Sequence, residues 1–132
     1  MKKILLMLVT WSLLASAMHA QSNNLPSSVI RSTQEGDSRA LAQGFNDNIE
    51  IILPNKSGVV YSKSQAEYIM GDFFRQNPPT SFAIIHQGQR ENSSFAIGKY
   101  GSSNGAFRFS FLTKSEGGAI LIIQIRIEKE NE

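Results

Sequence analysis

Residues 62–79, SKSQAEYIMGDFFRQNPP, carry the clearest structural signal in the sequence. Ser62 stands where a helix N-cap is expected, and Gln65 follows at the spacing of a capping box. Beyond it, apolar residues recur every three or four positions, which predicts an amphipathic helix with one buried side. Pro78 and Pro79 end the helix, because proline cannot continue its hydrogen bonds. The predicted buried stripe consists of Ala66, Ile69, Met70, Phe73 and Phe74.

The sequence after this helix is typical of a β-meander. Four segments rich in aromatic and β-branched residues are separated by short turns of Gly, Asn, Ser and charged residues. Turns of this length join antiparallel neighbours. The predicted strands are residues 81–87, 95–100, 106–114 and 119–129.

Two short helices and two short strands are predicted before residue 62. The first helix ends at Gly36, and the second has Asp37 as its N-cap and ends at Gly44. The strands span residues 49–53 and 59–61. This order predicts an α+β domain, in which helices pack on one face of a bent antiparallel sheet.

Alternation along the strands predicts which side chains face the helices. The row Phe107, Phe109 and Phe111 is assigned to the helix-covered face. On the last strand, the same face is assigned to Leu121, Ile123, Ile125 and Ile127. The opposite face is then mostly polar, with one apolar spot through which two copies could pair. That spot consists of Leu112, Ile120 and Ile122.

The N-terminus has the layout of a secretory signal peptide. Lys2 and Lys3 precede an apolar run, and small residues follow it. The run is too short for a transmembrane helix, which needs about 20 residues. Cleavage points after Ala17 and after Ala20 compete, and we expect cleavage after Ala20. The sequence therefore predicts an exported chain, periplasmic or secreted, without a transmembrane anchor.

Signal cleavage would change the charge balance of the chain. The full sequence has 13 Lys and Arg against 11 Asp and Glu, and loss of the two lysines leaves 11 against 11. A neutral chain without a basic cluster is unlike proteins that neutralise phosphates, so we expect no nucleic-acid partner. No cysteine is present, which excludes disulfides and a lipid-modified cysteine. The expected organisation is a signal peptide (1–20), a leader with the first helix (21–35) and one domain (36–132).

Several short runs of the sequence occur together in a known family. They are YSKSQAE at 61–67, DFF at 72–74, NPP at 77–79, SF at 81–82, HQG at 86–88, FAIGKY at 95–100 and IRIEK at 125–129. From about Gly36 onward the chain resembles a family of small exported bacterial proteins, domain of unknown function 4783. The order of elements likewise resembles the nuclear transport factor 2-like, cystatin-like cone, which implies the fold. The resemblance implies no activity, because the catalytic residues of isomerases and dehydratases in this superfamily match no motif here.

The sequence offers no convincing motif for catalysis or metal binding. It contains no H-E-x-x-H, no EF-hand loop and no complete phosphate loop. The letters of G-x-S-x-G occur at 101–105, but in a predicted turn between two strands, whereas the motif needs a strand-to-helix turn. His86 is the only histidine after the predicted signal peptide, so a multi-histidine zinc site cannot be built. We therefore expect no cofactor and no metal, and the interpretation leans away from an enzyme.

Two titratable residues remain as candidates for acid/base chemistry. His86 shares a strand side with Phe82 and Ile84, which would direct it into the cone as a general base. A hydrogen-bonded histidine at the end of the sheet is the alternative. Glu50, with Asp47 just before it, could be a buried carboxylate of the kind that ketosteroid isomerases use. Exposed carboxylates on strands are, however, far commoner.

Tyrosines and basic residues are the remaining candidates for ligand contacts. Tyr61 could take part in catalysis, and Tyr68 and Tyr100 could bind a ligand through their hydroxyl groups. Tyrosine at the mouth of a cone more often packs with its hydroxyl in water. Four basic residues could bind an acidic ligand or form a solvated sheet face with Glu91 and Glu128. These four are Arg90, Lys99, Arg108 and Arg126.

Three functions fit these observations. The first is a non-catalytic binding or protein-interaction module, with a homodimer through the apolar spot as one form. The second is an isomerase- or dehydratase-like enzyme for a small hydrophobic ligand, which needs His86, Glu50 and a tyrosine to converge on one cavity. A cone filled by Phe107, Phe109 and Phe111 contradicts this second function. The third is a structural envelope protein.

Overall fold

The computed structural model describes residues 25–130 and contains all the predicted helices. α1 (Ser27–Glu35) ends at Gly36, whose φ of 66° is left-handed, as a glycine C-cap requires. α2 (Ser38–Ala42) begins after Asp37, whose carboxylate accepts a hydrogen bond from the backbone N–H of Ala40. The local signals in the sequence therefore set both short helices.

The long helix α3 (Lys63–Gln76) begins with the predicted capping box. The Ser62 hydroxyl accepts from the backbone N–H of Gln65, and the Gln65 side chain accepts from the N–H of Ser62. The stripe it buries against the sheet is largely the predicted one. Ala66 and Met70 are fully buried, and Phe73 and Phe74 nearly so.

A six-stranded sheet, in the order β2-β1-β6-β5-β4-β3, completes the fold. β3, β4, β5 and β6 form the predicted antiparallel meander. β1 lies parallel to β6, so the sheet is mixed rather than purely antiparallel. No local pattern reports this pairing, because the two strands are far apart in the sequence. The strands are β1 (Phe45–Ile52), β2 (Val59–Ser62), β3 (Pro79–Arg90), β4 (Ser93–Ser102), β5 (Gly105–Glu116) and β6 (Ala119–Lys129).

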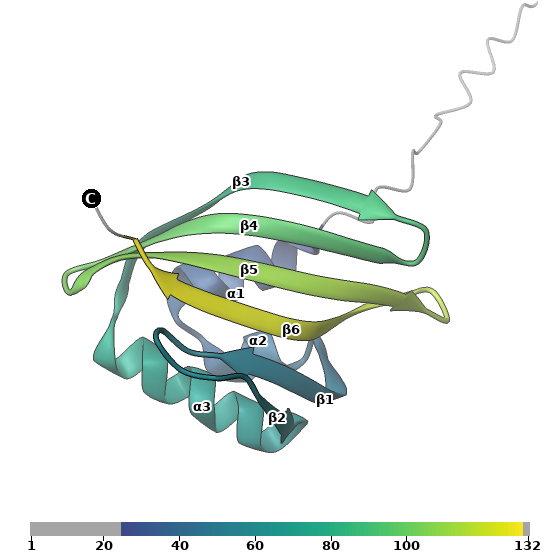
Figure 1. Cartoon of the computed structure of the whole chain (residues 1–132), viewed down its shortest axis with the longest axis horizontal. Coiled ribbons are helices and arrows are strands. Elements are labelled where there is room, and N and C mark those ends of the chain that lie inside the picture. The colour runs from purple at the N-terminus through teal and green to yellow at the C-terminus, as the bar shows by residue number, and fades with distance from the viewer. Residues whose placement is uncertain (1–24, 131–132) are drawn as a thin grey trace, which may run out of the picture.

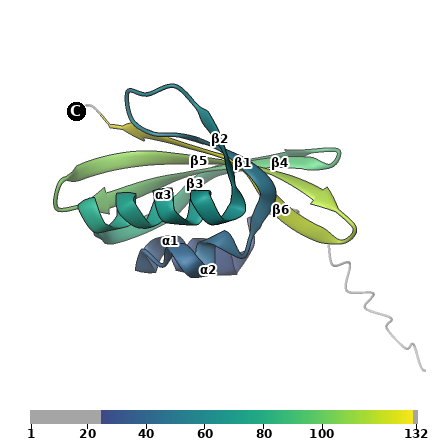
Figure 2. The ribbon, with the colours of Figure 1, turned by 90° about the horizontal axis from the view of Figure 1, so that it is seen from below.

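All three helices lie on one side of the sheet, and the other side is left open (Figures 1 and 2). α1 packs against β3, while α3 packs against β1, β2 and α2. The Gln34 side chain of α1 donates a hydrogen bond to the backbone carbonyl of Phe82 at 3.2 Å. The first helix is therefore an integral part of the domain. Among residues 25–130, no helix combines the length and apolar character needed to cross a membrane.

A β-bulge at Ile123 overturns the predicted faces of the last strand. Leu112 pairs with Gln124 but the next residue, Thr113, pairs with Ile122, so Ile123 is an extra residue without a partner. One extra residue reverses the alternation on the N-terminal side of the bulge. Ile125 and Ile127 are fully buried as predicted, but Leu121 and Ile123 are only half-buried.

The predicted apolar spot for pairing two copies does not form, for the same reason. Ile122 is 1% exposed and belongs to the helix-covered core. Ile120, two residues earlier on the strand, shares its side, while Leu112 lies on the open face. The run AILII has apolar residues at every position, so its sequence could not signal the bulge.

We expect Ile122→Ala to lower the free energy of unfolding by about 2–5 kcal/mol, the usual cost of emptying a fully buried isoleucine site. Leu121→Ala is the matched control, because Leu121 is half-buried. Urea denaturation of both variants measures the difference. A larger loss for Leu121→Ala would contradict the bulge and restore simple alternation.

Candidate interaction surface

Aromatic rings fill the interior of the cone between α3 and the sheet. Tyr100 and Phe109 are fully buried and stack at 4.7 Å between ring centroids, 15° from parallel. Phe73 of α3 meets Phe107 edge-on at 5.1 Å and Phe109 at 5.7 Å. These side chains occupy the space that a substrate pocket in the cone would need.

Tyr100 is part of this filling and not a ligand-binding residue at the cone mouth. Its hydroxyl donates a hydrogen bond to the backbone carbonyl of Asn77, the C-cap of α3, at 2.5 Å. Burial raises the pKa of the Tyr100 hydroxyl well above its usual value, because the ionised form would lose its hydration. The side chain therefore ties the end of α3 to β4.

The two other tyrosines share a surface hollow beside the first half of α3. Tyr61 of β2 and Tyr68 of α3 line a volume of about 370 Å³ together with Ser64, Gln65 and Ile69. The Tyr68 side chain is exposed, and the Arg75 guanidinium lies 6.0 Å from its ring centre. The structure thus brings Tyr61 and Tyr68 together in a hollow that neither His86 nor Glu50 lines.

His86 does not point into the cone as predicted. Ile84 pairs with Gly98 but His86 pairs with Ile97, so Ile85 is an extra residue in β3. This second bulge reverses the faces to which the residues after Ile85 point. His86 is therefore exposed on the open face of the sheet. Alternation counted from Phe82 could not report it.

Glu50 also lies on the open face and far from His86. It alternates with the buried Ile49 and Ile51 and accepts a hydrogen bond from the Gln124 side chain at 2.7 Å. Its strand, β1, is separated from β3 by β6, β5 and β4, which is about 19 Å at usual strand spacing. Asp47 is exposed at the start of β1. The predicted acid and base therefore cannot act on one small substrate.

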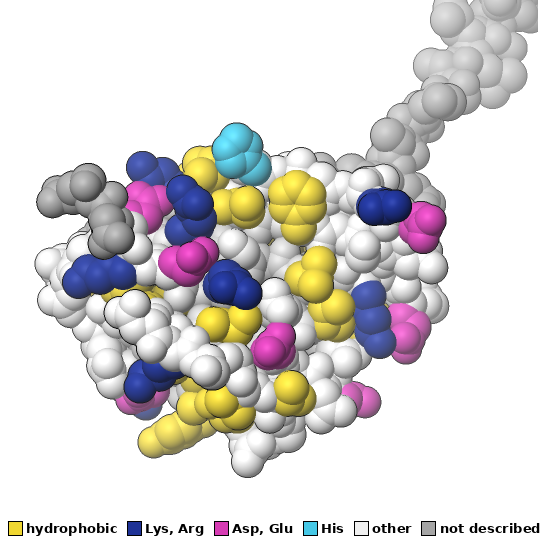
Figure 3. All heavy atoms as spheres, viewed as in Figure 1, with side chains coloured by type: hydrophobic (Ala, Val, Ile, Leu, Met, Phe, Trp, Pro, Cys, Tyr) yellow, Lys and Arg dark blue, Asp and Glu magenta, His cyan; other side chains and the backbone are white. Residues whose placement is uncertain are grey.

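The open face carries an exposed apolar group near its β3 edge (Figure 3). Ile85 is 42% and Phe95 46% exposed, and Ile97 and Leu112 are half-buried. Phe95 pairs directly with Leu112 on one side and with Gly88 on the other. A Cβ at Gly88 would lie 2.7 Å from a ring carbon of Phe95, so this glycine lets the ring lie against β3. We call Ile85, Phe95, Ile97 and Leu112 the apolar group.

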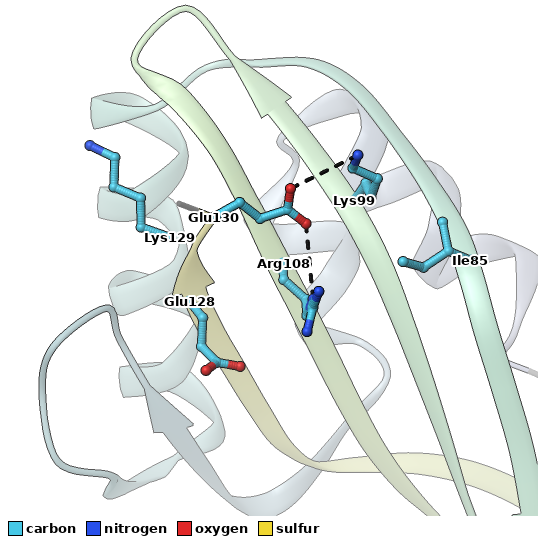
Figure 4. Close-up of a pocket in the computed structure, with 6 residues that line it drawn as sticks. All are labelled: Ile85, Lys99, Arg108, Glu128, Lys129 and Glu130. Atoms are coloured by element: carbon cyan, nitrogen blue, oxygen red, sulfur yellow. Dashed lines mark ion pairs between the residues drawn. The ribbon is translucent and has the colours of Figure 1, made fainter. Parts of the chain in front are cut away.

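A charged hollow of about 410 Å³ adjoins the apolar group at Ile85 (Figure 4). Lys99 of β4 and Arg108 of β5 project into it, and the Glu130 carboxylate lies 3.9 Å from each cation. The sequence analysis named Arg90, Lys99, Arg108 and Arg126 as ligands for an acidic group or as a solvated sheet face. It missed Ile85, Phe95 and Ile97, which come together only through the pairing of β3, β4 and β5. The hollow is lined by Ile85, Lys99, Arg108, Glu128, Lys129 and Glu130.

The family model for a domain of unknown function, DUF4783, matches residues 26–128 of this chain. The chain belongs to this family. A crystal structure of a DUF4783 family protein from Bacteroides ovatus is 34% identical, with a TM-score of 0.80 over 83% of this chain and 99% of that chain. The family match begins at residue 26 and thus includes α1.

More distant structures show the same fold at low identity. A domain of unknown function with a cystatin-like fold from Nostoc punctiforme is 8% identical, with a TM-score of 0.64 over 80% of this chain and 73% of that one. An NTF-2 like protein of unknown function from Silicibacter pomeroyi is 11% identical, with a TM-score of 0.61 over 79% and 88%. The fold of this DUF4783 chain is therefore cystatin-like and nuclear transport factor 2-like, as the resemblance implied. No curated protein matches the chain.

Tyr100→Phe should lower the free energy of unfolding by about 1 kcal/mol at neutral pH, because the Asn77 carbonyl loses its donor. It should also flatten the alkaline end of the stability profile. In the unfolded wild type Tyr100 ionises near pH 10, whereas in the folded protein its pKa is raised, so stability falls as pH rises above about 10. Urea denaturation of both proteins from pH 7 to 11 tests this. Equal alkaline slopes would show that Tyr100 does not cause the loss.

Proposed function

We propose that this chain is an exported, non-catalytic interaction module that contacts another protein through the open face of its sheet. The observation that carries the proposal is the apolar group, where two side chains, Ile85 and Phe95, are more than two-fifths exposed. Large exposed apolar side chains gathered on one face mark a site of association.

The arrangement around the apolar group supports a protein partner. Stable interfaces have an aromatic or apolar centre with polar and charged residues at the rim. Here an exposed phenylalanine lies at the centre, and charged pairs lie towards both ends of the strands. Lys114 and Glu116 form the pair at one end, at 2.9 Å. Arg108 and Glu130 form the pair at the other end, in the charged hollow.

The packing inside the cone favours this function over acid/base catalysis. Phe107, Phe109 and Phe111 are all at most 5% exposed, which is the condition under which the enzyme hypothesis fails. His86 and Glu50 stand on the open face with three strands between them. The residues described include no group of three potential metal ligands. The fold hosts many functions, so the surface that is available decides between them.

Phe95 is the position at which the interaction should be lost most clearly. A photoreactive phenylalanine analogue is introduced at Phe95 in the producing cells. It should form an adduct with the partner, whether this is another protein or a second copy of this chain. Phe95→Arg should then weaken binding of the purified partner at least tenfold, because it places a charge at the centre of the contact. Sedimentation velocity reports the same loss if the partner is a second copy.

Tyr68 provides the matched control for this experiment. It is an equally large exposed aromatic residue, but it lies on α3, away from the open face. Tyr68→Arg should change binding less than twofold. Equal adducts at both positions, or none at Phe95 together with a monomeric protein, would contradict the interaction module and favour a structural envelope role.

Export is the second part of the proposal and needs its own measurement. The signal peptide lies outside the described residues, and the sequence pattern alone supports it. N-terminal sequencing of the protein from periplasmic and culture fractions should yield a chain that begins at Gln21 or, after the competing cleavage, at Met18. Recovery of a chain that retains Lys2 and Lys3, in the cytoplasmic fraction only, would overturn export.

A further inference from the structure

Two positive charges lie directly opposite each other on the open face. Lys99 of β4 and Arg108 of β5 are cross-strand partners in the antiparallel ladder. Like charges in this arrangement repel and destabilise the sheet. Their side chains are 60% and 51% exposed, so water screens the repulsion but leaves both cations accessible. The pair thus forms an accessible positive site that does not contribute to the stability of the sheet.

The chain places one of its own carboxylates at this site. Glu130, just beyond the end of β6, has one oxygen 3.9 Å from the Lys99 ammonium and the other 3.9 Å from Arg108 Nε (Figure 4). Charge-assisted hydrogen bonds are about 2.7–2.9 Å long, so these contacts are ion pairs without hydrogen bonds. Both cations therefore keep donors that a better-placed carboxylate could use.

The Glu130 side chain can leave without unfolding its strand. Its backbone N–H donates to the carbonyl of Ala106 at 2.9 Å, which holds the main chain in place. Within residues 25–130, the polar contacts of this 24% exposed side chain are the two long ion pairs, and ion pairs with exposed partners contribute little to stability.

The neighbouring carboxylate does not take part in this arrangement. Glu128 is the cross-strand partner of Arg108, yet within residues 25–130 it forms no ion pair. Lys129 lines the hollow but its side chain points away from it (Figure 4), so two basic and two acidic side chains remain and the hollow becomes positive when Glu130 moves away. Ile85 lines the hollow together with the two cations and also belongs to the apolar group, so the charged and apolar surfaces are adjacent.

We propose that Lys99 and Arg108 form a binding site for an acidic side chain of the partner protein, and that Glu130 occupies this site until the partner displaces it. The inference rests on the proposed function and adds the chemistry of the partner: a segment in which acidic and apolar residues alternate. Its carboxylate takes the place of Glu130, and its apolar side chains lie on Ile85 and Phe95. Glu130 lowers the apparent affinity by the fraction of molecules in which it fills the site.

A peptide probe tests this chemistry without knowledge of the natural partner. The peptide acetyl-Glu-Leu-Glu-Leu-Glu-amide is titrated into the protein purified from its producing cells, with any natural processing complete. Binding is measured from the NMR chemical shifts of the backbone amides. The peptide with Gln in place of Glu is the comparison. We expect shifts at Lys99, Arg108 and Glu130 with the acidic peptide only, and a loss of affinity of tenfold or more in Arg108→Gln.

The two carboxylates of the hollow supply the decisive control. Glu130→Gln should raise the affinity about three- to tenfold, because it removes the competitor. Glu128→Gln removes the same charge two residues earlier in the chain and should raise the affinity less than twofold. Equal gains in both variants would show general electrostatic attraction and overturn the displacement. Equal binding of the Glu and Gln peptides would overturn the site itself.

The inference and the proposed function can fail separately. If Phe95→Arg abolishes partner binding while Arg108→Gln leaves it unchanged, the interaction module stands and the acidic site is wrong. If neither variant changes binding of the partner captured at Phe95, the open face is not the interface. The interaction module and the site for an acidic side chain are then both wrong.

Discussion

The contact of Phe73 from the helix layer with the stacked rings of Tyr100 and Phe109 in the sheet holds the two layers of the molecule together. Phe73 from α3 packs edge-on against Phe109 and at a tilt against Tyr100, so one aromatic cluster joins the helix to β4 and β5. Aromatic side chains bury large areas and prefer such offset and edge-to-face geometries. The cluster also includes a polar anchor, because the Tyr100 hydroxyl satisfies the Asn77 carbonyl where α3 ends.

A filled cone has a direct consequence for where function can lie. When rings occupy the interior, a partner or ligand can reach only the outer surfaces, and the helices already cover one side of the sheet (Figure 2). The open side is therefore the largest surface that β-structure presents to the surroundings. Its composition is mixed, with an exposed Phe95 beside charged residues.

Two single-residue bulges decide what this open surface contains. The bulge at Ile85 places His86 on the open face, and the bulge at Ile123 sends Ile122 into the core. Each therefore exchanges residues between the core and the surface without changing the strand order. The near balance of charge over the whole chain likewise conceals a local arrangement, in which Lys99 and Arg108 are placed side by side.

The helices, the turns of the meander and the fold class could all be predicted from local sequence patterns. Those depend on contacts within a few residues, such as the Ser62–Gln65 capping box and the left-handed Gly36. Tertiary structure alone decided the parallel pairing of β1 with β6, both bulges and the surface that follows from them. A strand of apolar residues on both sides fits either register, so its neighbours and the packing of the aromatic core select one. The basic residues of the candidate site and Leu112 were therefore predictable, whereas the position of Phe95 and Ile97 beside them depends on strand pairing that no local pattern encodes.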